Sequence, residues 1–88
     1  MIAFGALIKT ARKAKGITLA GLGDMVDSHQ GYLSGIERGS VRPPLPRLVK
    51  KLAIALGMDY HALLAAAIVE KLPEDLDRSA LLKILSEG

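Results

Sequence analysis

The sequence contains no cysteine and no tryptophan, and aromatic residues account for only 3% of the chain. Without cysteine, neither a disulfide framework nor a thiolate zinc site can form. The two histidines, His29 and His61, have no ligand-like neighbours, so we expect no metal and no other cofactor. The longest uninterrupted apolar stretch, residues 62–69, is far below the roughly 20 residues that span a bilayer, so we expect no membrane association.

The start of the chain also lacks the pattern of a secretory signal. Residues 1–8 are largely apolar, but no basic residues precede them, and the first basic residues follow them instead. We therefore expect a cytoplasmic protein.

The charges are unevenly distributed along the 88 residues. Residues 1–51 carry nine basic and three acidic side chains, which gives +6. Residues 52–88 carry three basic and six acidic side chains, which gives −3. A basic half joined to an acidic half suggests that the first half meets a polyanion such as nucleic acid, although a basic surface can also be merely solvated.

Apolar residues recur at helical intervals, and no segment alternates as a half-buried strand would. The sequence therefore predicts an all-α fold. The expected helices, in chain order, cover about residues 4–15, 18–26, 29–37, 45–56, 59–72 and 74–85. The residues expected on their apolar faces are Phe4, Leu7, Ile8, Ala11, Leu22, Met25, Val26, Leu33, Ile36, Leu45, Leu48, Val49, Leu52, Leu56, Leu63, Leu64, Ala67, Ile68 and Leu72, followed by Leu76, Ala80, Leu81, Ile84 and Leu85 in the last helix.

Capping residues mark several of these boundaries. Thr18 and Asp59 are suited to accept a hydrogen bond from the first turn of the helices that follow them. Gly16, Gly39 and Gly57 stand where helices are expected to end. The second and third helices contain four glycines, each costing roughly 1 kcal/mol relative to alanine, so packing must hold these helices or another backbone must approach them closely.

A specific motif lies between Gly16 and Pro43. It contains Gly-Ile-Thr at 16–18, Tyr-Leu-Ser at 32–34, Ile-Glu-Arg-Gly at 36–39 and Arg-Pro at 42–43. Over residues 3–69 the chain resembles the phage-repressor (Cro-like, xenobiotic-response-element) helix-turn-helix family of transcriptional regulators. The resemblance implies a five-helix, lambda-repressor-like domain with a C-terminal helical extension. We place the DNA-binding domain at 1–71 and the extension at 72–88.

The turn between the second and third helices has its own requirements. A small residue at Gly23 lets the second helix cross the third at close range. Asp27 stands where relatives usually have a glycine in the left-handed conformation, which aspartate tolerates at some cost. The resemblance further implies a partly buried salt bridge between Arg12 and Glu37, joining the first helix to the third.

In this family the third helix enters the major groove with its N-terminal end toward the bases. The resemblance makes Gln30 the leading base-reading candidate, because glutamine can form two hydrogen bonds to adenine. His29 and Ser34 are the next candidates, and His29 could equally be an exposed or capping residue.

The remaining DNA candidates are assigned to phosphates, because hydroxyl and guanidinium donors near the ends of a groove-bound helix reach the backbone. They are Thr18, Ser28, Tyr32, Arg38 and Arg42, with Lys9, Lys13, Arg47 and Lys50 as weaker candidates. Ser28 could instead cap the third helix.

Besides Asp27, the sequence departs from the family at three positions that bear on base reading. Leu19 replaces a glutamine that in relatives braces the reading residue, and Gly31 and Gly35 remove side chains from positions that relatives use for reading. We therefore expect few direct base contacts, with specificity resting on DNA shape, bridging water and a second half-site.

The extension at 72–88 carries apolar residues on an acidic background, and they cannot all face one small core. We expect a homodimer or partner contact through Leu76, Leu81, Leu82, Ile84 and Leu85. The alternative is a terminal helix that folds back onto its own domain.

These features favour a double-stranded DNA-binding regulator, inferred from the family to be a repressor that binds a palindromic operator as a homodimer. Two alternatives remain: an antitoxin-type autoregulator with a protein partner, and a protein-interaction module without DNA binding. We expect no enzyme, because no carboxylate pair, oriented nucleophile or phosphate-binding loop is visible.

Overall fold

The computed structural model describes residues 3–72, and these form five helices. The helices are α1 (Phe4–Ala14), α2 (Leu19–Val26), α3 (Gln30–Arg38), α4 (Pro46–Leu56) and α5 (Tyr60–Lys71). No strand occurs in this range, so the prediction of an all-α, five-helix domain is confirmed. The helix expected at 74–85, with Leu76, Leu81, Leu82, Ile84 and Leu85, lies outside the described residues. None of the helices between 3 and 72 is both long and apolar enough to cross a membrane.

Side chains cap the N-termini of three helices. The Thr18 hydroxyl accepts a hydrogen bond from Gly21 N at 2.9 Å, and the Asp59 carboxylate accepts one from His61 N at 3.1 Å, as the sequence predicts. The cap of α3 is the His29 imidazole, whose Nδ1 accepts from Gly31 N at 2.9 Å. Ser28, which was also considered for this role, is therefore not the cap.

The cap at Thr18 gives a direct stability prediction. Thr18→Ala leaves an N–H of the first turn of α2 without its acceptor, so the free energy of unfolding should fall by about 1 kcal/mol in urea titrations. Thr10→Ala is the matched control, because Thr10 is exposed within α1 and caps nothing. Equal effects of the two substitutions would contradict a capping role for Thr18.

Three helices end in the left-handed conformation. Asp27 (φ 54°), Gly39 (φ 76°) and Gly57 (φ 66°) follow α2, α3 and α4. Such residues reverse the chain direction and let the next N–H groups bond back to the last helical carbonyls. These tight ends allow five short helices to pack around one core.

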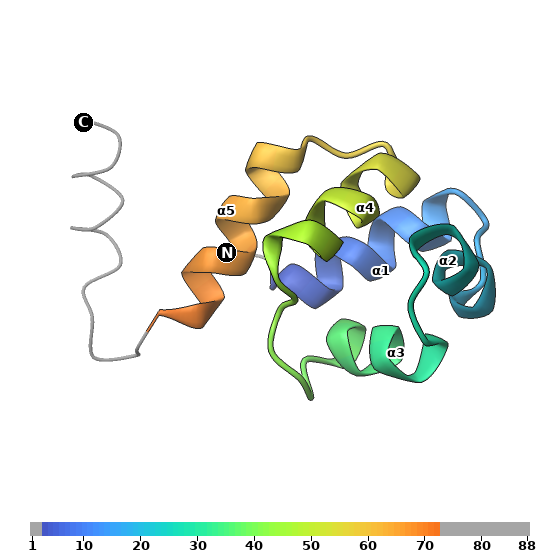
Figure 1. The fold of residues 1–88 in the computed structure, drawn as a ribbon, viewed down its shortest axis with the longest axis horizontal. Helices are drawn as coiled ribbons and strands as arrows, with labels where there is room; N and C mark the ends of the chain where they lie inside the picture. The colour runs from blue at the N-terminus through green and yellow to red at the C-terminus, as the bar shows by residue number, and fades with distance from the viewer. Residues whose placement is uncertain (1–2, 73–88) are drawn as a thin grey trace.

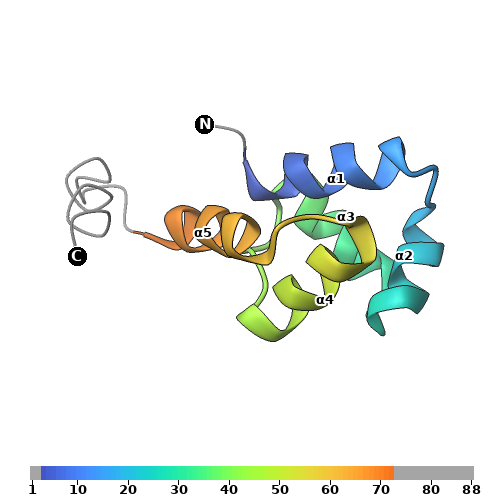
Figure 2. The same ribbon diagram turned by 90° about the horizontal axis from the view of Figure 1, so that it is seen from above.

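All five helices contribute to a single hydrophobic core. Its buried residues are Phe4, Ile8, Leu22, Val26, Leu33, Ile36, Val49, Leu52, Ala53, Leu56, Leu63 and Ala67. Most were expected from the helical spacing. Figure 2 shows α1 and α4 on opposite sides of the domain, and in both Figure 1 and Figure 2 α2 packs at one end while α5 leads away at the other.

The packing leaves α3 partly uncovered. It lies along the lower edge of the domain in Figure 1 and makes its main contacts with α1 and α2. Leu33 and Ile36 point into the core, whereas Gln30, Gly31 and Tyr32 are exposed. The outer face of α3 is therefore available for binding.

Three residues expected to face inward do not. Met25 lies in α2 but is 54% exposed, because α2 buries Leu22 and Val26 instead. Leu45 is the residue before α4 rather than part of it, and it is 73% exposed. Ile68 is 48% exposed, and the neighbouring Val69 is buried instead. In its last turns α5 packs against the start of α1, which places Val69 and not Ile68 toward the rest of the domain.

The last turn of α5 is attached at two points. The Glu70 carboxylate accepts a hydrogen bond from Phe4 N, the first amide of α1. Lys71 Nζ donates to the Pro44 carbonyl oxygen at 3.1 Å, which joins the end of α5 to the segment before α4. A carboxylate at the start of a helix is favoured by the exposed N–H groups there.

Candidate nucleic-acid interface

The turn between α2 and α3 has the geometry that the sequence predicts. Asp27 adopts the left-handed conformation, and Ser28 N donates to Gly23 O at 2.9 Å. A Cβ atom on Gly23 would lie 2.5 Å from the Ser28 carbonyl oxygen and 3.6 Å from Gln30 N. Because only glycine leaves room for this backbone approach, Gly23 sets the angle at which α3 leaves the turn.

Arg12 and Glu37 form a salt bridge that joins α3 to α1. Arg12 Nε and Nη2 donate to the two Glu37 carboxylate oxygens at 2.7 and 3.0 Å, and Nη1 donates to the Ile17 carbonyl oxygen at 2.9 Å. The exposed fractions of the two side chains are only 11% and 4%. One guanidinium thus joins α1, the segment before α2, and α3.

The same contacts set the ionisation of Arg12. The hydrogen bond to Glu37 raises the pKa of Arg12, burial opposes the rise, and the Glu37 charge adds to it. A raised arginine pKa contributes stability that is fully present below the pKa of the unfolded chain and is lost as the pH rises through the higher pKa of the folded chain. Arg12 therefore stays charged throughout the ordinary pH range.

Gly5 is a second point of close approach, and sequence reasoning did not single it out. A Cβ atom there would overlap the Ile36 carbonyl oxygen and lie 2.8 Å from the Glu37 carbonyl oxygen. The backbone of α1 therefore runs directly against the C-terminal turn of α3. Nothing in the local sequence marks Gly5, because the contact joins residues more than thirty positions apart.

The three base-reading candidates differ in exposure. Gln30 is exposed in the first turn of α3, and His29 is exposed immediately before it. Because His29 Nδ1 accepts the capping hydrogen bond, the proton of the neutral ring is on Nε2. Ser34 is half-buried, one turn further along the helix.

The expectation that Gly31 and Gly35 both vacate reading positions is half wrong. Gly31 is exposed beside His29, but Gly35 is buried. A Cβ atom on Gly35 would contact Ser40 and Val41 at 3.3 and 3.4 Å. Gly35 therefore serves the packing of the α3–α4 segment, and only Gly31 removes a side chain from the outer face.

Comparison with known families agrees with this geometry. The helix-turn-helix family model matches residues 8–63, which include α2, the turn and α3. The chain belongs to the helix-turn-helix family. No curated protein matches the sequence.

Solved structures give the same fold. SinR of Bacillus subtilis, in a crystal structure with DNA, is 34% identical with a TM-score of 0.64, and the match covers 69% of this chain and 97% of that chain. The structure of the SinR protein in complex with the SinI protein is 28% identical with a TM-score of 0.64, covering 96% of this chain and 77% of that one. The clp gene regulator ClgR of Corynebacterium glutamicum is 30% identical with a TM-score of 0.62, covering 81% and 91%. The lambda-repressor-like helix-turn-helix resemblance is therefore confirmed.

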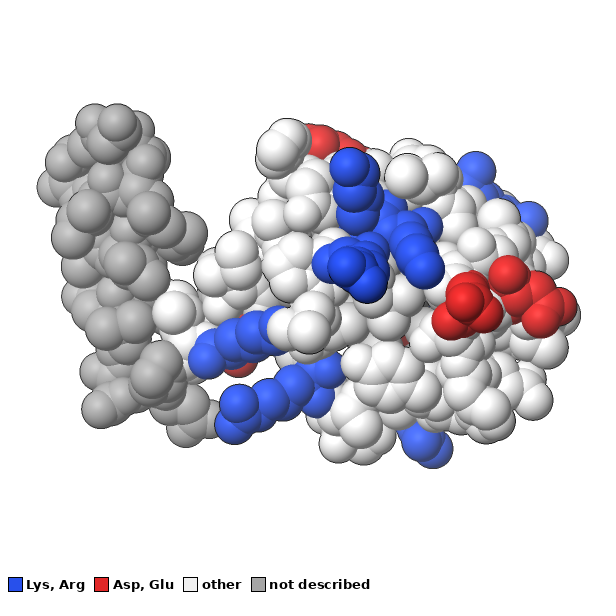
Figure 3. Space-filling model, in the orientation of Figure 1, with Lys and Arg blue, Asp and Glu red and all other residues white. Residues whose placement is uncertain are grey.

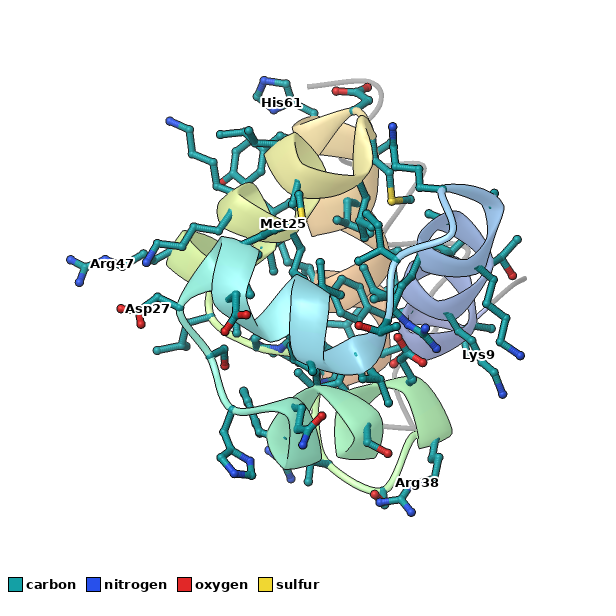
Figure 4. All side chains as sticks on the ribbon, turned by 90° about the vertical axis from the view of Figure 1, so that its right-hand side faces the viewer. Lys9, Met25, Asp27, Arg38, Arg47 and His61 are labelled. Carbon is teal, nitrogen blue, oxygen red and sulfur yellow. The ribbon has the colours of Figure 1, made fainter. Side chains whose placement is uncertain are left out.

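The phosphate candidates of this helix-turn-helix unit lie around α3. Ser28 and Tyr32 line a common groove near its N-terminal end, while Arg38 and Arg42 are exposed at and beyond its C-terminal end. Thr18 is exposed at the start of α2. In Figure 4, Arg38 lies beside α3 at the bottom, whereas Lys9 and Arg47 project to opposite sides of the domain above it. Hydroxyl donors therefore lie near the N-terminal end of α3, and guanidinium donors lie at and beyond its C-terminal end.

Sequence reasoning missed the groove itself. It lies between the α2–α3 turn and the first half of α4, has a volume of about 300 Å³, and includes Ser28, Tyr32, Pro44 and Arg47 in its lining. Its residues come from three separate segments of the chain, so no local pattern could have revealed it. Among residues 3–72 there is also no cluster of side chains able to hold a metal ion.

Proposed function

We propose that the protein is a sequence-specific double-stranded DNA-binding transcriptional regulator that represses by occupying a palindromic operator as a homodimer. The observation that carries the proposal is the exposed outer face of α3, held rigidly by α1 and α2 and presenting Gln30 at its N-terminal end. A rigid support favours recognition, because a bidentate contact to a base needs a well-defined side-chain position. The DNA-bound structure of the similar SinR supports the same use of this fold.

In this proposal each exposed side chain has a role. Gln30 reads a base, and His29, with its Nε2–H free, donates to a base acceptor or a phosphate. Ser34 is a further base-reading candidate. Thr18, Ser28, Tyr32, Arg38 and Arg42 bind phosphates and fix the position of α3 in the groove.

The proposed homodimer rests on the small number of base contacts that one copy of α3 can make. One exposed glutamine and its neighbours give few base contacts, so two half-sites about one DNA turn, roughly 34 Å, apart would supply the missing specificity. We assign the contact between the two copies to Leu76, Leu81, Leu82, Ile84 and Leu85 of the extension at 72–88.

A second candidate function is regulation by a protein partner, as in an antitoxin-type autoregulator. The observation that favours it is the similarity over 96% of this chain to the SinR–SinI complex, which contains a second protein. Co-purification of a second small protein with the native chain would support this candidate.

Binding to the DNA upstream of the protein's own gene tests the leading proposal. Fluorescence anisotropy should show at least about a hundredfold preference for this duplex over a scrambled one. Gln30→Ala should lose most of that preference. Arg42→Ala should weaken both duplexes equally and reduce the slope of log affinity against log salt by about one unit.

Lys15→Ala is the matched control for the loss of a positive charge, because Lys15 follows α1 on the side of Gly57 and away from α3. It should leave the preference and the salt slope nearly unchanged. Equal binding of both duplexes by the native chain would contradict sequence-specific recognition. A stoichiometry of one chain per duplex in the same titration would contradict the homodimer.

A further inference from the structure

An apolar surface with a basic rim runs along the exposed side of α4. It joins two grooves, one of about 300 Å³ beside the α2–α3 turn and one of about 430 Å³ between α2 and the end of α4, and Lys51 lines both. We call this surface the α4 groove. Leu45 and Ile54 in its lining are each 73% exposed, and Met25 is 54% exposed. These are the most exposed large apolar side chains of the described range.

The α4 groove is also positively charged. Arg47 and Lys51 line it, Lys50 is exposed on the same helix, and none of the three forms an ion pair within the described range. In Figure 3 basic side chains gather over α4, while acidic ones lie to the right over α2. Asp27 is the one acidic residue in the lining. The groove thus suits an occupant that is both apolar and acidic.

The chain itself contains such a segment. Residues 73–88 include Glu74, Asp75, Asp77 and Glu87 against two basic residues, Arg78 and Lys83. Leu76, Ala80, Leu81 and Ile84 recur at the spacing of one helix face. As a helix, Leu76 to Ile84 would span about 12 Å, close to the roughly 10 Å from Leu48 to Ala55 along α4.

The end of α5 is linked to the α4 groove through one residue of its lining. Lys71 Nζ donates to the carbonyl oxygen of Pro44, and Pro44 lines the groove. Leu72 is extended (ψ 145°), as a residue before proline prefers, and Pro73 stops α5 from continuing. A segment that follows Leu72 is therefore tethered within a few residues of Pro44, and the tether gives it a high effective concentration at the groove.

We propose that the α4 groove binds the chain's own residues 73–88 in the free protein. The segment runs along α4 from Pro44 toward Ile54, with its apolar face against the groove and its first acidic residues beside Arg47 and Lys51. This closed state competes with the dimer proposed above, because both use the same apolar side chains. It also places acidic residues next to Ser28 and Tyr32, where they oppose DNA phosphates.

Disulfide trapping tests the closed state directly, because the native chain has no cysteine. The full chain carrying Ile54→Cys and Ile84→Cys should form an intramolecular disulfide under mild oxidation. The control pair is Ile68→Cys with Ile84→Cys, because Ile68 is an exposed isoleucine on α5 outside the groove. The groove pair should react at least about tenfold faster than the control pair, since docking raises the local concentration at one site only.

The result is read on non-reducing gels, where an internally bridged monomer and a covalent dimer migrate differently. Lys51→Glu in the groove pair should slow the reaction several-fold, and Lys15→Glu, the same change of charge outside the groove, should not. A covalent dimer as the main product would overturn the proposal, because the segment would then belong to a second copy. A rate no greater than that of the control pair would also overturn it. Both readouts are independent of DNA binding, so they stand apart from the test of the proposed function.

Discussion

Arg12→Met should lower the free energy of unfolding by about 3–5 kcal/mol, because it leaves the buried Glu37 carboxylate without its partner. The loss exceeds that of a surface ion pair, which is worth about 1 kcal/mol or less, since the Glu37 side chain is only 4% exposed. The Ile17 carbonyl oxygen loses its hydrogen bond in the same variant. Urea denaturation followed by circular dichroism measures the change.

Two further variants separate the buried pair from the loss of an arginine. Arg38→Met removes a neighbouring exposed arginine and should change stability by about 0.5 kcal/mol or less. The double variant Arg12→Met with Glu37→Leu should be more stable than Arg12→Met alone, because no charge is left buried without a partner. If Arg12→Met and Arg38→Met had the same effect, the pair between α1 and α3 would not hold the fold together.

Gly5→Ala should destabilise the domain by about 3 kcal/mol or more, although alanine is the better helix former. The added methyl would overlap the Ile36 carbonyl oxygen, and a helix backbone cannot yield as a flexible side chain can. Relief requires α1 and α3 to separate, which also strains the Arg12–Glu37 hydrogen bonds. Thermal unfolding should show a large drop in Tm.

Gly31→Ala is the comparison for Gly5→Ala. A Cβ atom on Gly31 meets only the His29 ring, at 3.0 Å, and that ring is exposed and can turn. Its effect should therefore be small, with the gain in helix propensity offsetting a weaker cap. A tolerated Gly5→Ala would show that α1 and α3 do not meet as closely as the structure describes.

The sequence was sufficient to predict the five helices between residues 3 and 72, most of the core and the turn before α3. Periodicity and capping residues are local signals, and Thr18, Asp59 and Gly39 behave as those signals indicate. The inward assignment of Ile68 failed because the face that α5 buries in its last turns depends on where α1 begins. A local pattern cannot contain that information.

The sequence also predicted only part of the candidate site. The exposed position of Gln30 follows from the placement of α3, and the family resemblance supplied that placement. The role of Gly35 was misjudged because its neighbours, Ser40 and Val41, fold back beneath the helix only after the chain reverses at Gly39. The groove along α4 could not be predicted, since it is formed by segments that meet only in the folded domain.

The attachment of α3 to the rest of the domain has a consequence for folding. The segment from His29 to Gly39 is short and contains three glycines, so in isolation it would not persist as a helix in water. It acquires its shape when Leu33, Ile36 and Glu37 meet α1, across a loop of more than twenty residues. The outer face of α3 therefore takes its shape only when the domain folds around it, and a partly unfolded chain does not present it.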